Sequence, residues 1–142
     1  MFSVDSETGR LRDVLLCKPD HYHWIDTNAV AHATLTEGAA ADPARLHTQY
    51  KELESALSQA GVTLHHTTPE PHLPYQVYTR DSSQTTPWGP VLTTLAMPQR
   101  RGEYASILKF HEPHGGFHQY TTAGTVEGGD IHIIHPGLLV IG

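Results

Sequence analysis

The sequence predicts an α/β fold, and three observations lead to this class. A strand-like apolar run, an amphipathic helix and a second strand-like run follow one another within residues 10–66. The 10 prolines and 12 glycines indicate many turns and short elements rather than a helical bundle. At 142 residues the chain can bury a core without disulfides, so one domain spanning residues 1–142 is expected.

The first strand is expected in residues 10–19, "RLRDVLLCKP". An apolar run from Val14 to Cys17 supports it, and the strand closes at Pro19, which cannot donate a hydrogen bond to a neighbouring strand. Residues 20–41 follow neither a helical nor a strand period. We therefore expect a long, mostly irregular segment there.

The clearest local signal predicts a helix over residues 42–61. Asp42 is suited to cap its first turn, Pro43 to occupy the first helical position, and Gly61 to adopt the left-handed conformation that ends a helix. Residues 62–66, "VTLHH", read as a strand directly afterwards. One apolar stripe runs along the helix at spacings of three and four: Leu46, Tyr50, Leu53, Leu57 and Ala60.

The second half of the chain is predicted to consist of short elements between loops, after a proline-rich loop over residues 67–75. We expect an extended piece ending near Tyr78, a polar loop over 79–86, a strand over 91–96, a short helix across 100–110, a loop over 111–124, and strands over 125–134 and 138–141.

Charge and composition exclude several classes of partner. The net charge of -6 argues against nucleic acid, because phosphate binding needs a concentrated basic patch. The N-terminus has no basic stretch followed by an apolar one, and no apolar run approaches the roughly 20 residues that span a bilayer. We therefore expect a soluble, unexported, cytoplasmic protein without a membrane partner. The single cysteine, Cys17, fits a reducing cytosol.

The segment "YTRDSS" contains a charged pair, Arg80 and Asp81, directly after an expected strand. Proteins of the α/β class place binding residues at such positions. In an alternative interpretation, Asp81 bonds to the backbone of its own loop and Arg80 is its surface partner. Loop aspartates of that kind are common, so this motif alone does not define a site.

The segment "VEGGD" places two glycines between Glu127 and Asp130. Glycine permits a sharp turn or a close approach to a ligand, so the two carboxylates can converge. Converging carboxylates are costly to bury unless a cationic ligand, a metal or a structural arginine meets them. A guanidinium suits such a site, since its planar fork binds carboxylates two at a time, and Asp81 can join the pair. A hairpin turn with two solvated acids is the alternative.

Together these segments resemble the guanidine-modifying enzymes of the pentein superfamily. The resemblance is carried by "VYTRDSSQTTPWGPVLTTLAMPQRRGEYA", by "TAGTVEGGDIHIIHPGLLVIG" and by the opening "GRLRDVLLCKP", and so covers nearly the whole chain. The superfamily includes arginine deiminases, dimethylarginine dimethylaminohydrolases and amidinotransferases. It implies an α/β-propeller of ββαβ-type units around a central polar site, of which this chain would hold about half the blades.

The resemblance also implies roles for individual residues. Asp81 matches the aspartate that grips the substrate guanidinium, and Glu127 matches the glutamate that orients the substrate and the catalytic histidine. Asp130 matches an aspartate that supports the motif. Arg100 aligns with an arginine that binds the substrate carboxylate, although Arg101 is an alternative register for that match.

The family chemistry implies further groups. Tyr78 lies where the family places an aromatic wall. A cysteine thiolate attacks the guanidinium carbon, a histidine moves protons, and water or an amine resolves the covalent intermediate. No metal and no cofactor is implied. The family places that histidine and cysteine beyond the segments matched here. Cys17 lies amid apolar residues, where a thiol is usually inert.

Two function classes follow. In the first, the chain is the N-terminal part of a guanidino C–N hydrolase or amidinotransferase for arginine or a methylated arginine, inert alone and completed by a second chain or a C-terminal half. In the second, it is a non-catalytic module that binds arginine-like cations or holds a metal through its histidines. The histidines considered for the metal are His111, His114, His118, His132 and His135.

Overall fold

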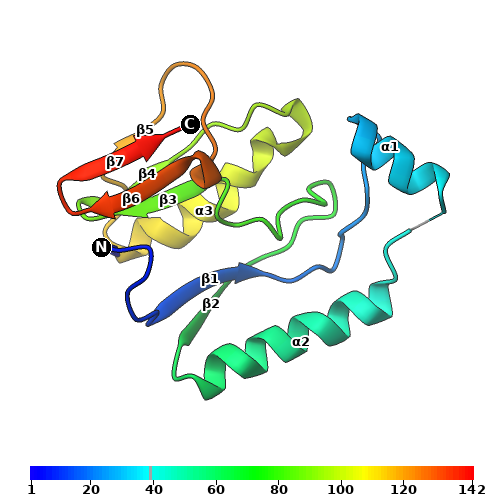
Figure 1. Cartoon of the computed structure of the whole chain (residues 1–142), viewed down its shortest axis with the longest axis horizontal. Coiled ribbons are helices and arrows are strands. Elements are labelled where there is room, and N and C mark those ends of the chain that lie inside the picture. Colours follow the sequence, from blue (N-terminus) through cyan, green and yellow to red (C-terminus); the bar gives the residue numbers. More distant parts are fainter. Residues whose placement is uncertain (39) are drawn as a thin grey trace. The chain divides into compact units, whose positions relative to one another are not determined.

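The computed structural model describes residues 1–38 and 40–142 and divides the chain into two compact units. Unit 1 comprises Met1–Arg12 and Tyr78–Gly142, and unit 2 comprises Asp13–Val77. Helices and strands are present in each (Figure 1), which confirms the α/β class. Unit 2 thus begins and ends within the sequence of unit 1.

Unit 2 is built around two parallel strands, β1 (Asp13–Cys17) and β2 (Thr63–Thr67), connected through α1 (Ala29–Thr36) and α2 (Pro43–Gln59). The α2 helix begins as the sequence predicts, because the Asp42 side chain accepts hydrogen bonds from two backbone N–H groups of the first turn. None of its residues is fully buried. The core of this unit comes mainly from the strands and loops, at Cys17, Ala31, Val62, Leu73 and Tyr75.

The segment over residues 20–41, predicted to be mostly irregular, contains one helix that the sequence analysis missed, α1. The Asn28 side chain caps this helix by accepting a hydrogen bond from the Ala31 N–H at 2.9 Å. An asparagine before an apolar run is a helix start signal. It was missed because the helix is only eight residues long and its apolar residues form no clear stripe.

Unit 1 contains two antiparallel strand pairs, one parallel strand pair and several short helical segments. Strand β3 (Ser83–Thr86) pairs with β4 (Gly89–Leu92), which pairs in parallel with the short β5 (Gln119–Tyr120). Strands β6 (Ile131–His135) and β7 (Leu138–Ile141) form a hairpin. The helical segments are η1 (Pro98–Glu103), α3 (Tyr104–His111), η2 (Glu112–His114) and η3 (Gly128–Asp130).

Several boundaries in unit 1 differ from prediction, among them two in the sheet of β3 and β4. The expected polar loop over residues 79–86 contains β3, whose polar residues are mostly buried. The expected strand over residues 91–96 begins earlier and continues beyond Leu92 only as a single bridge between Thr94 and Val126. Alternation of apolar and polar residues could not reveal β3, since it is buried through serine, glutamine and threonine side chains.

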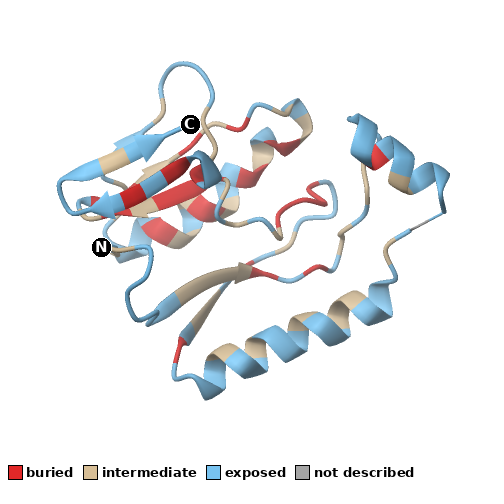
Figure 2. Cartoon of the chain, in the orientation of Figure 1, coloured by how far each residue is buried: buried red, intermediate tan, exposed pale blue. Residues whose placement is uncertain are grey.

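The core of unit 1 lies on α3 and the strands (Figure 2), with Leu95, Ile107, Ile131 and Ile133 its buried hydrophobic residues. The N-terminal segment joins the two pairings. The Val4 N–H donates to the Thr86 carbonyl at 3.1 Å, and a Glu7 carboxylate oxygen accepts from the Ile133 N–H at 3.1 Å.

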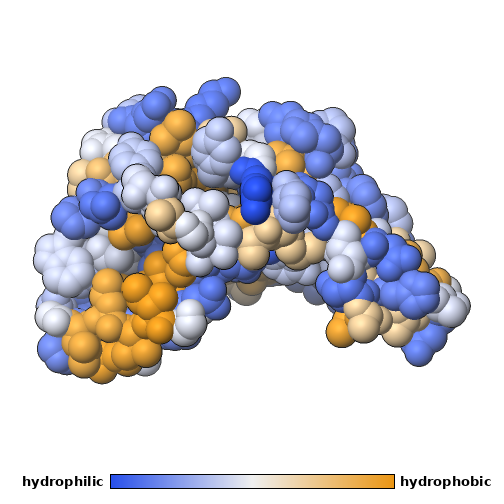
Figure 3. Space-filling view, turned by 90° about the horizontal axis from the view of Figure 1, so that it is seen from above, coloured by the Kyte–Doolittle hydropathy of each residue, from blue (hydrophilic) through white to orange (hydrophobic). Residues whose placement is uncertain are grey.

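The hairpin of β6 and β7 carries exposed hydrophobic side chains. Figure 3 shows hydrophobic surface gathered on the left of the view, the side on which Figure 1 draws this hairpin. In the part of the chain that the structure describes, β7 pairs with β6 alone. The exposed residues are Ile134, Leu138, Val140 and Ile141.

Candidate functional site

A buried arginine occupies the centre of the polar cluster in unit 1. Arg100, in η1, is 6% exposed. Its Nε donates to Glu103 Oε1 at 2.9 Å and its Nη2 donates to Glu103 Oε2 at 2.9 Å. These parallel bonds form the bidentate geometry that makes arginine–carboxylate pairs strong and directional. Glu103 is itself 2% exposed.

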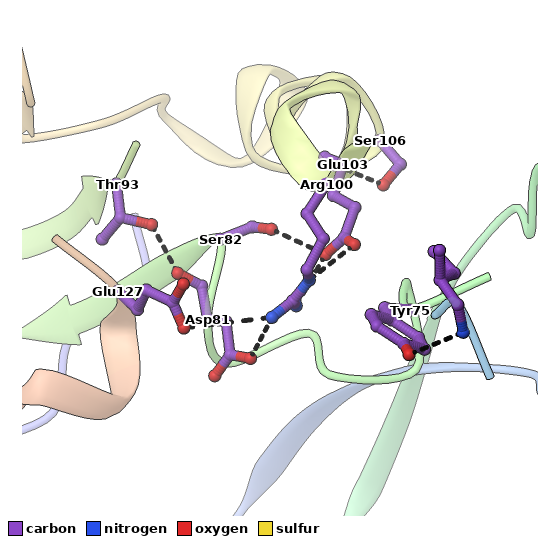
Figure 4. Close-up of polar contacts among 9 residues, drawn as sticks. Tyr75, Asp81, Ser82, Thr93, Arg100, Glu103, Ser106 and Glu127 are labelled. Atoms are coloured by element: carbon purple, nitrogen blue, oxygen red, sulfur yellow. Dashed lines mark hydrogen bonds and ion pairs between the residues drawn. The ribbon is translucent and has the colours of Figure 1, made fainter. Parts of the chain in front are cut away.

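Two further carboxylates meet the same guanidinium from distant parts of the sequence (Figure 4). Arg100 Nη1 donates to Asp81 Oδ2 at 3.0 Å and lies 3.9 Å from Glu127 Oε2. Asp81 immediately precedes Ser82 and β3, and Glu127 immediately precedes η3. Two of the three carboxylates that the sequence analysis singled out therefore converge on one cation, and that cation is a structural arginine.

Backbone and hydroxyl contacts fix the position of Asp81. Its carbonyl accepts hydrogen bonds from Thr93 Oγ1 at 2.5 Å and from the Gly128 N–H at 2.8 Å. Its own N–H donates to the Tyr78 carbonyl at 3.0 Å. The loop before β3 is therefore held by both β4's continuation and the "EGGD" turn.

Gly128 explains why the "EGGD" turn needs a glycine at its first position. A Cβ atom there would lie 1.9 Å from the Arg80 carbonyl oxygen and 2.6 Å from the Ser83 carbonyl oxygen, so no larger side chain fits. At Gly129 the nearest atom to a Cβ would be Asp81 Oδ1 at 3.6 Å, an ordinary contact. The first glycine thus lets the turn approach the backbone around Asp81 and brings Glu127 toward Arg100.

Asp130 stabilises the turn rather than joining the cluster. Its Oδ2 accepts a hydrogen bond from the Glu127 N–H at 3.1 Å, and the residue is exposed. Asp130 was expected to help surround a guanidinium together with Asp81 and Glu127. Among the described residues, Asp81 and Glu127 contact the Arg100 guanidinium and Asp130 makes no ion pair with it.

The cluster holds more negative than positive charge. Three carboxylates face one guanidinium, so the formal charge is -2 when all three acids are ionised. Burial lowers the pKa of Arg100, but the hydrogen bonds and charges of Glu103, and then Asp81, outweigh burial and raise it. Burial raises the pKa of Glu103, and the Arg100 guanidinium opposes that change. Excess negative charge in a partly buried site favours a second cation.

Two residues complete the surroundings of Arg100. The Tyr78 ring centroid lies 5.6 Å from the Arg100 guanidinium carbon, within the range of a cation–π contact. Ser82 Oγ donates to Glu103 Oε2 at 3.5 Å. The sequence analysis missed Glu103, although its position three residues after Arg100 is a spacing at which side chains meet on a helical turn.

The histidines considered for a metal site have other partners in the structure. His111 is buried against the rings of Phe110 and Phe117, whereas His114 Nδ1 pairs with the Phe110 carbonyl. Within residues 1–38 and 40–142, no three histidine, cysteine, aspartate or glutamate residues are grouped to hold a metal ion. The His-bound metal alternative is therefore not supported by the described geometry.

Cys17 lies in β1 of unit 2 and is 2% exposed. Its thiol donates to the Lys18 carbonyl at 3.6 Å. A thiol enclosed in this way has no access to a substrate, in agreement with the interpretation of Cys17 as a small buried side chain.

No helix among the described residues is long and apolar enough to cross a membrane.

The fold and the carboxylate cluster define a class, the guanidine-modifying α/β proteins of the pentein superfamily, as the motifs predicted. A family model for arginine deiminase matches residues 23–142. The chain therefore belongs to the arginine deiminase family.

The chain is also similar to one curated protein and to several solved structures. The uncharacterized protein YkgA of Bacillus subtilis (strain 168) is 29% identical over 140 residues, which cover 96% of this chain and 47% of that protein. The dimethylarginine dimethylaminohydrolase of Pseudomonas aeruginosa, solved with citrulline, gives a TM-score of 0.67 at 21% identity, covering 85% of this chain and 46% of that chain.

A further structural neighbour is AgrE, solved in complex with L-arginine. It gives a TM-score of 0.73 at 21% identity and covers 85% of this chain and 18% of that chain. At these identities the likeness shows the fold. The chain spans about half the length of the curated relative it matches.

Proposed function

We propose that this chain supplies the guanidinium-binding carboxylates of a hydrolase or amidinotransferase that acts on the guanidino C–N bond of arginine or a methylated arginine. The observation that carries the proposal is the convergence of Asp81 and Glu127 on one guanidinium, at 3.0 and 3.9 Å. The geometry of the pair is therefore already suited to this cation. The relatives solved with L-arginine and with citrulline support the choice of substrate class.

The side chains of Asp81 and Glu127 are partly exposed, so a substrate can reach them. Their side chains are 24% and 30% exposed, whereas the Arg100 side chain is 7% exposed. In this proposal Arg100 lies behind the two carboxylates and holds them in position, while their exposed oxygens receive the substrate guanidinium. Fixed donors and acceptors of this kind lower the cost of orienting a substrate.

The remaining assigned residues take supporting roles. Tyr78 is 44% exposed and offers an aromatic wall to a planar cation. Asp130 holds the turn that carries Glu127. The role that the family resemblance implies for Arg100, binding of a substrate carboxylate, stays a prediction, since its Nε, Nη1 and Nη2 all donate to carboxylates here.

The chemical step needs groups from outside the matched region. In the proposed reaction a cysteine thiolate attacks the guanidinium carbon, the amine leaves with a proton from a histidine, and water or an amine then breaks the C–S bond. The one cysteine of this chain is buried in unit 2. We therefore propose that a second chain or a C-terminal half supplies the histidine and the nucleophile and completes an α/β-propeller.

Binding is tested by titrating L-arginine into the protein in a calorimeter. Wild type is expected to give saturable heats, and Asp81→Asn to weaken binding by about tenfold or more, as expected for a charge-assisted hydrogen bond. Glu112→Gln, which neutralises an exposed acid of the same unit, is the matched control and should bind as wild type does. Equal heats for wild type and Asp81→Asn would remove Asp81 from the site.

Turnover is tested separately, with arginine and methylarginines as substrates. The chain alone is expected to release neither citrulline nor amine. Turnover that persists in Cys17→Ala would contradict the need for a nucleophile from elsewhere, because Cys17 is the single cysteine in the sequence.

A further inference from the structure

A pocket lies in unit 1, beside the carboxylate cluster. Its volume is about 300 Å³, which is the space of about ten water molecules in the liquid. It is formed where β4 and β5 pair, with Leu92 opposite Tyr120, and where η1 gives way to α3. This position makes it a feature of one unit, built from regular elements.

The rim of the pocket carries a cation. Arg101, Tyr104, Tyr120 and Thr121 line it. Arg101 is exposed. Its Nε donates to the Leu95 carbonyl at 3.3 Å and its Nη2 to the Ala96 carbonyl at 3.5 Å, which hold the side chain against the loop after β4. None of the ion pairs among residues 1–38 and 40–142 involves Arg101. The pocket therefore presents a guanidinium whose charge no carboxylate of the described chain neutralises.

The floor of the pocket is largely buried. Leu95, Thr93 and Ser82 line it and are 3%, 4% and 2% exposed, and Leu92 adds further apolar surface. The combination of an apolar interior with a single cation at the rim matches an anion that has an apolar body. A phosphate fits less well, because its greater charge and its lack of apolar surface call for several donors.

We propose that this pocket binds a small monocarboxylate with an apolar body, whose carboxylate pairs with Arg101. Neighbouring arginines then have separate tasks. Arg100 is directed inward to Asp81, Glu103 and Glu127, and Arg101 lines the pocket. The proposal does not depend on the guanidino chemistry of the cluster.

The floor residues connect the two sites. Ser82 Oγ donates to Glu103 Oε2 and Thr93 Oγ1 donates to the Asp81 carbonyl. A ligand that touches the floor therefore lies one side chain away from the groups that hold Arg100. A nuclear magnetic resonance titration is expected to show this contact as shifts at Ser82 and Thr93 in addition to the rim.

Benzoate is the probe, and benzamide is its neutral control of nearly the same shape. Titration into the full chain should give saturable binding of benzoate, at least tenfold weaker binding of benzamide, and weaker binding of inorganic phosphate. Arg101→Gln should lower benzoate affinity by about tenfold, as expected for loss of a charge-assisted hydrogen bond. Arg101→Lys, which keeps the charge but not the fork, should bind with intermediate affinity.

Arg10→Gln removes an exposed arginine of the same unit and is the charge-matched control, expected to bind benzoate as wild type does. Spectra of each variant verify that the fold is kept. The proposal is overturned if benzoate and benzamide bind alike, if phosphate binds more tightly than benzoate, or if Arg101→Gln and Arg10→Gln have the same effect. Because the probe has no guanidino group, failure here leaves the arginine titration unaffected.

Discussion

At Arg100, one buried guanidinium contacts carboxylates from three separate parts of the sequence. Glu103 lies three residues away in η1, Asp81 precedes β3 and Glu127 precedes η3. The pair with Glu103 is the most enclosed of these contacts, with side chains 7% and 3% exposed. Breaking such a pair leaves a charge buried without its partner, which costs more than the pair itself contributes.

Glu103→Ala is therefore expected to lower the free energy of unfolding by about 3 kcal/mol or more. Glu112→Ala, at an exposed acid, should change it by no more than about 0.5 kcal/mol. Urea denaturation followed by circular dichroism measures both. The double variant Arg100→Met with Glu103→Leu should lower the free energy of unfolding by less than Glu103→Ala does. A free energy of unfolding for Glu103→Ala within about 1 kcal/mol of wild type would contradict this explanation.

His111 gives unit 1 a pH dependence of its own. Burial, and then the charge of His114, lowers the pKa of His111 from 6.5 to about 4. Its Nδ1 is buried and has no hydrogen-bond partner among the described residues. The unfolded chain therefore binds a proton at higher pH than the folded chain does, so stability falls as the pH drops from 6.5 toward 4.

His111→Phe is expected to reduce the dependence of the free energy of unfolding on pH. For the whole pKa shift of His111, the loss of stability amounts to about 3 kcal/mol at most. Urea denaturation at several pH values between 7 and 4 measures the slope for wild type and variant. His132→Gln, at an exposed histidine of β6, should keep the wild-type slope. Parallel slopes for wild type and His111→Phe would show that another group carries the acid sensitivity.

Single residues show where the sequence was sufficient and where it was not. Asp81 and Glu127 could be singled out because carboxylates next to glycines and loops are recognisable without neighbours. Glu103 could not, because its importance depends on Arg100 being buried, and burial of an arginine in η1 follows from packing between segments far apart in the chain. The contact between Asp81 and Arg100 is of the same kind.

At the scale of elements, the turn through η3 depends on a backbone contact. A Cβ at position 128 would collide with the carbonyl oxygens of Arg80 and Ser83, whereas one at position 129 meets nothing closer than 3.6 Å. Neither glycine has a positive φ angle, so the difference between them is one of space.

Gly128→Ala is expected to lower the free energy of unfolding by about 3 kcal/mol, since overpacking against backbone forces η3 away from β3. Gly129→Ala should change it by less than about 1 kcal/mol and is the matched control. Urea denaturation compares the two. Equal stability of the variants would mean that the turn can move without cost, and that the close approach does not fix Glu127.

Elements with strong local signals were predicted well, and those formed by distant pairing were not. The start of α2 was recognisable from Asp42 and Pro43, because a cap and a proline act within a few residues. Strand β3 was missed because its partner β4 and its burial, rather than its own composition, make it a strand. The α/β class followed from the order of elements, which local signals are enough to reveal.

At the scale of the whole molecule, the two units differ in how well their helices and strands bury side chains. The longest helix of unit 2, α2, has no fully buried residue, and its sheet has two strands. Two-stranded pairings are marginal without further packing. Unit 1 adds to its hydrophobic core a buried arginine, Arg100, which pairs with Glu103 inside η1 and contacts Asp81 and Glu127 from other segments.

Unit 2 is therefore expected to unfold at lower urea concentration than unit 1. Each unit contains one of the two tryptophans, Trp24 in unit 2 and Trp88 in unit 1. Trp88→Phe leaves a fluorescence signal from unit 2 alone, and Trp24→Phe leaves one from unit 1 alone. The midpoint reported by Trp24 should be the lower one, and coincident transitions would show that the units unfold together.

The carboxylates around Arg100 also affect how this protein must be handled in the laboratory. If Asp81 and Glu127 accept a guanidinium ion, then guanidinium chloride is a ligand at low concentration as well as a denaturant at high concentration. A ligand that binds only the folded state raises its apparent stability, so a guanidinium unfolding curve would start with a false plateau. Urea carries no charge and avoids this artefact, and a difference between the two curves at low concentration would itself report occupancy of the cluster.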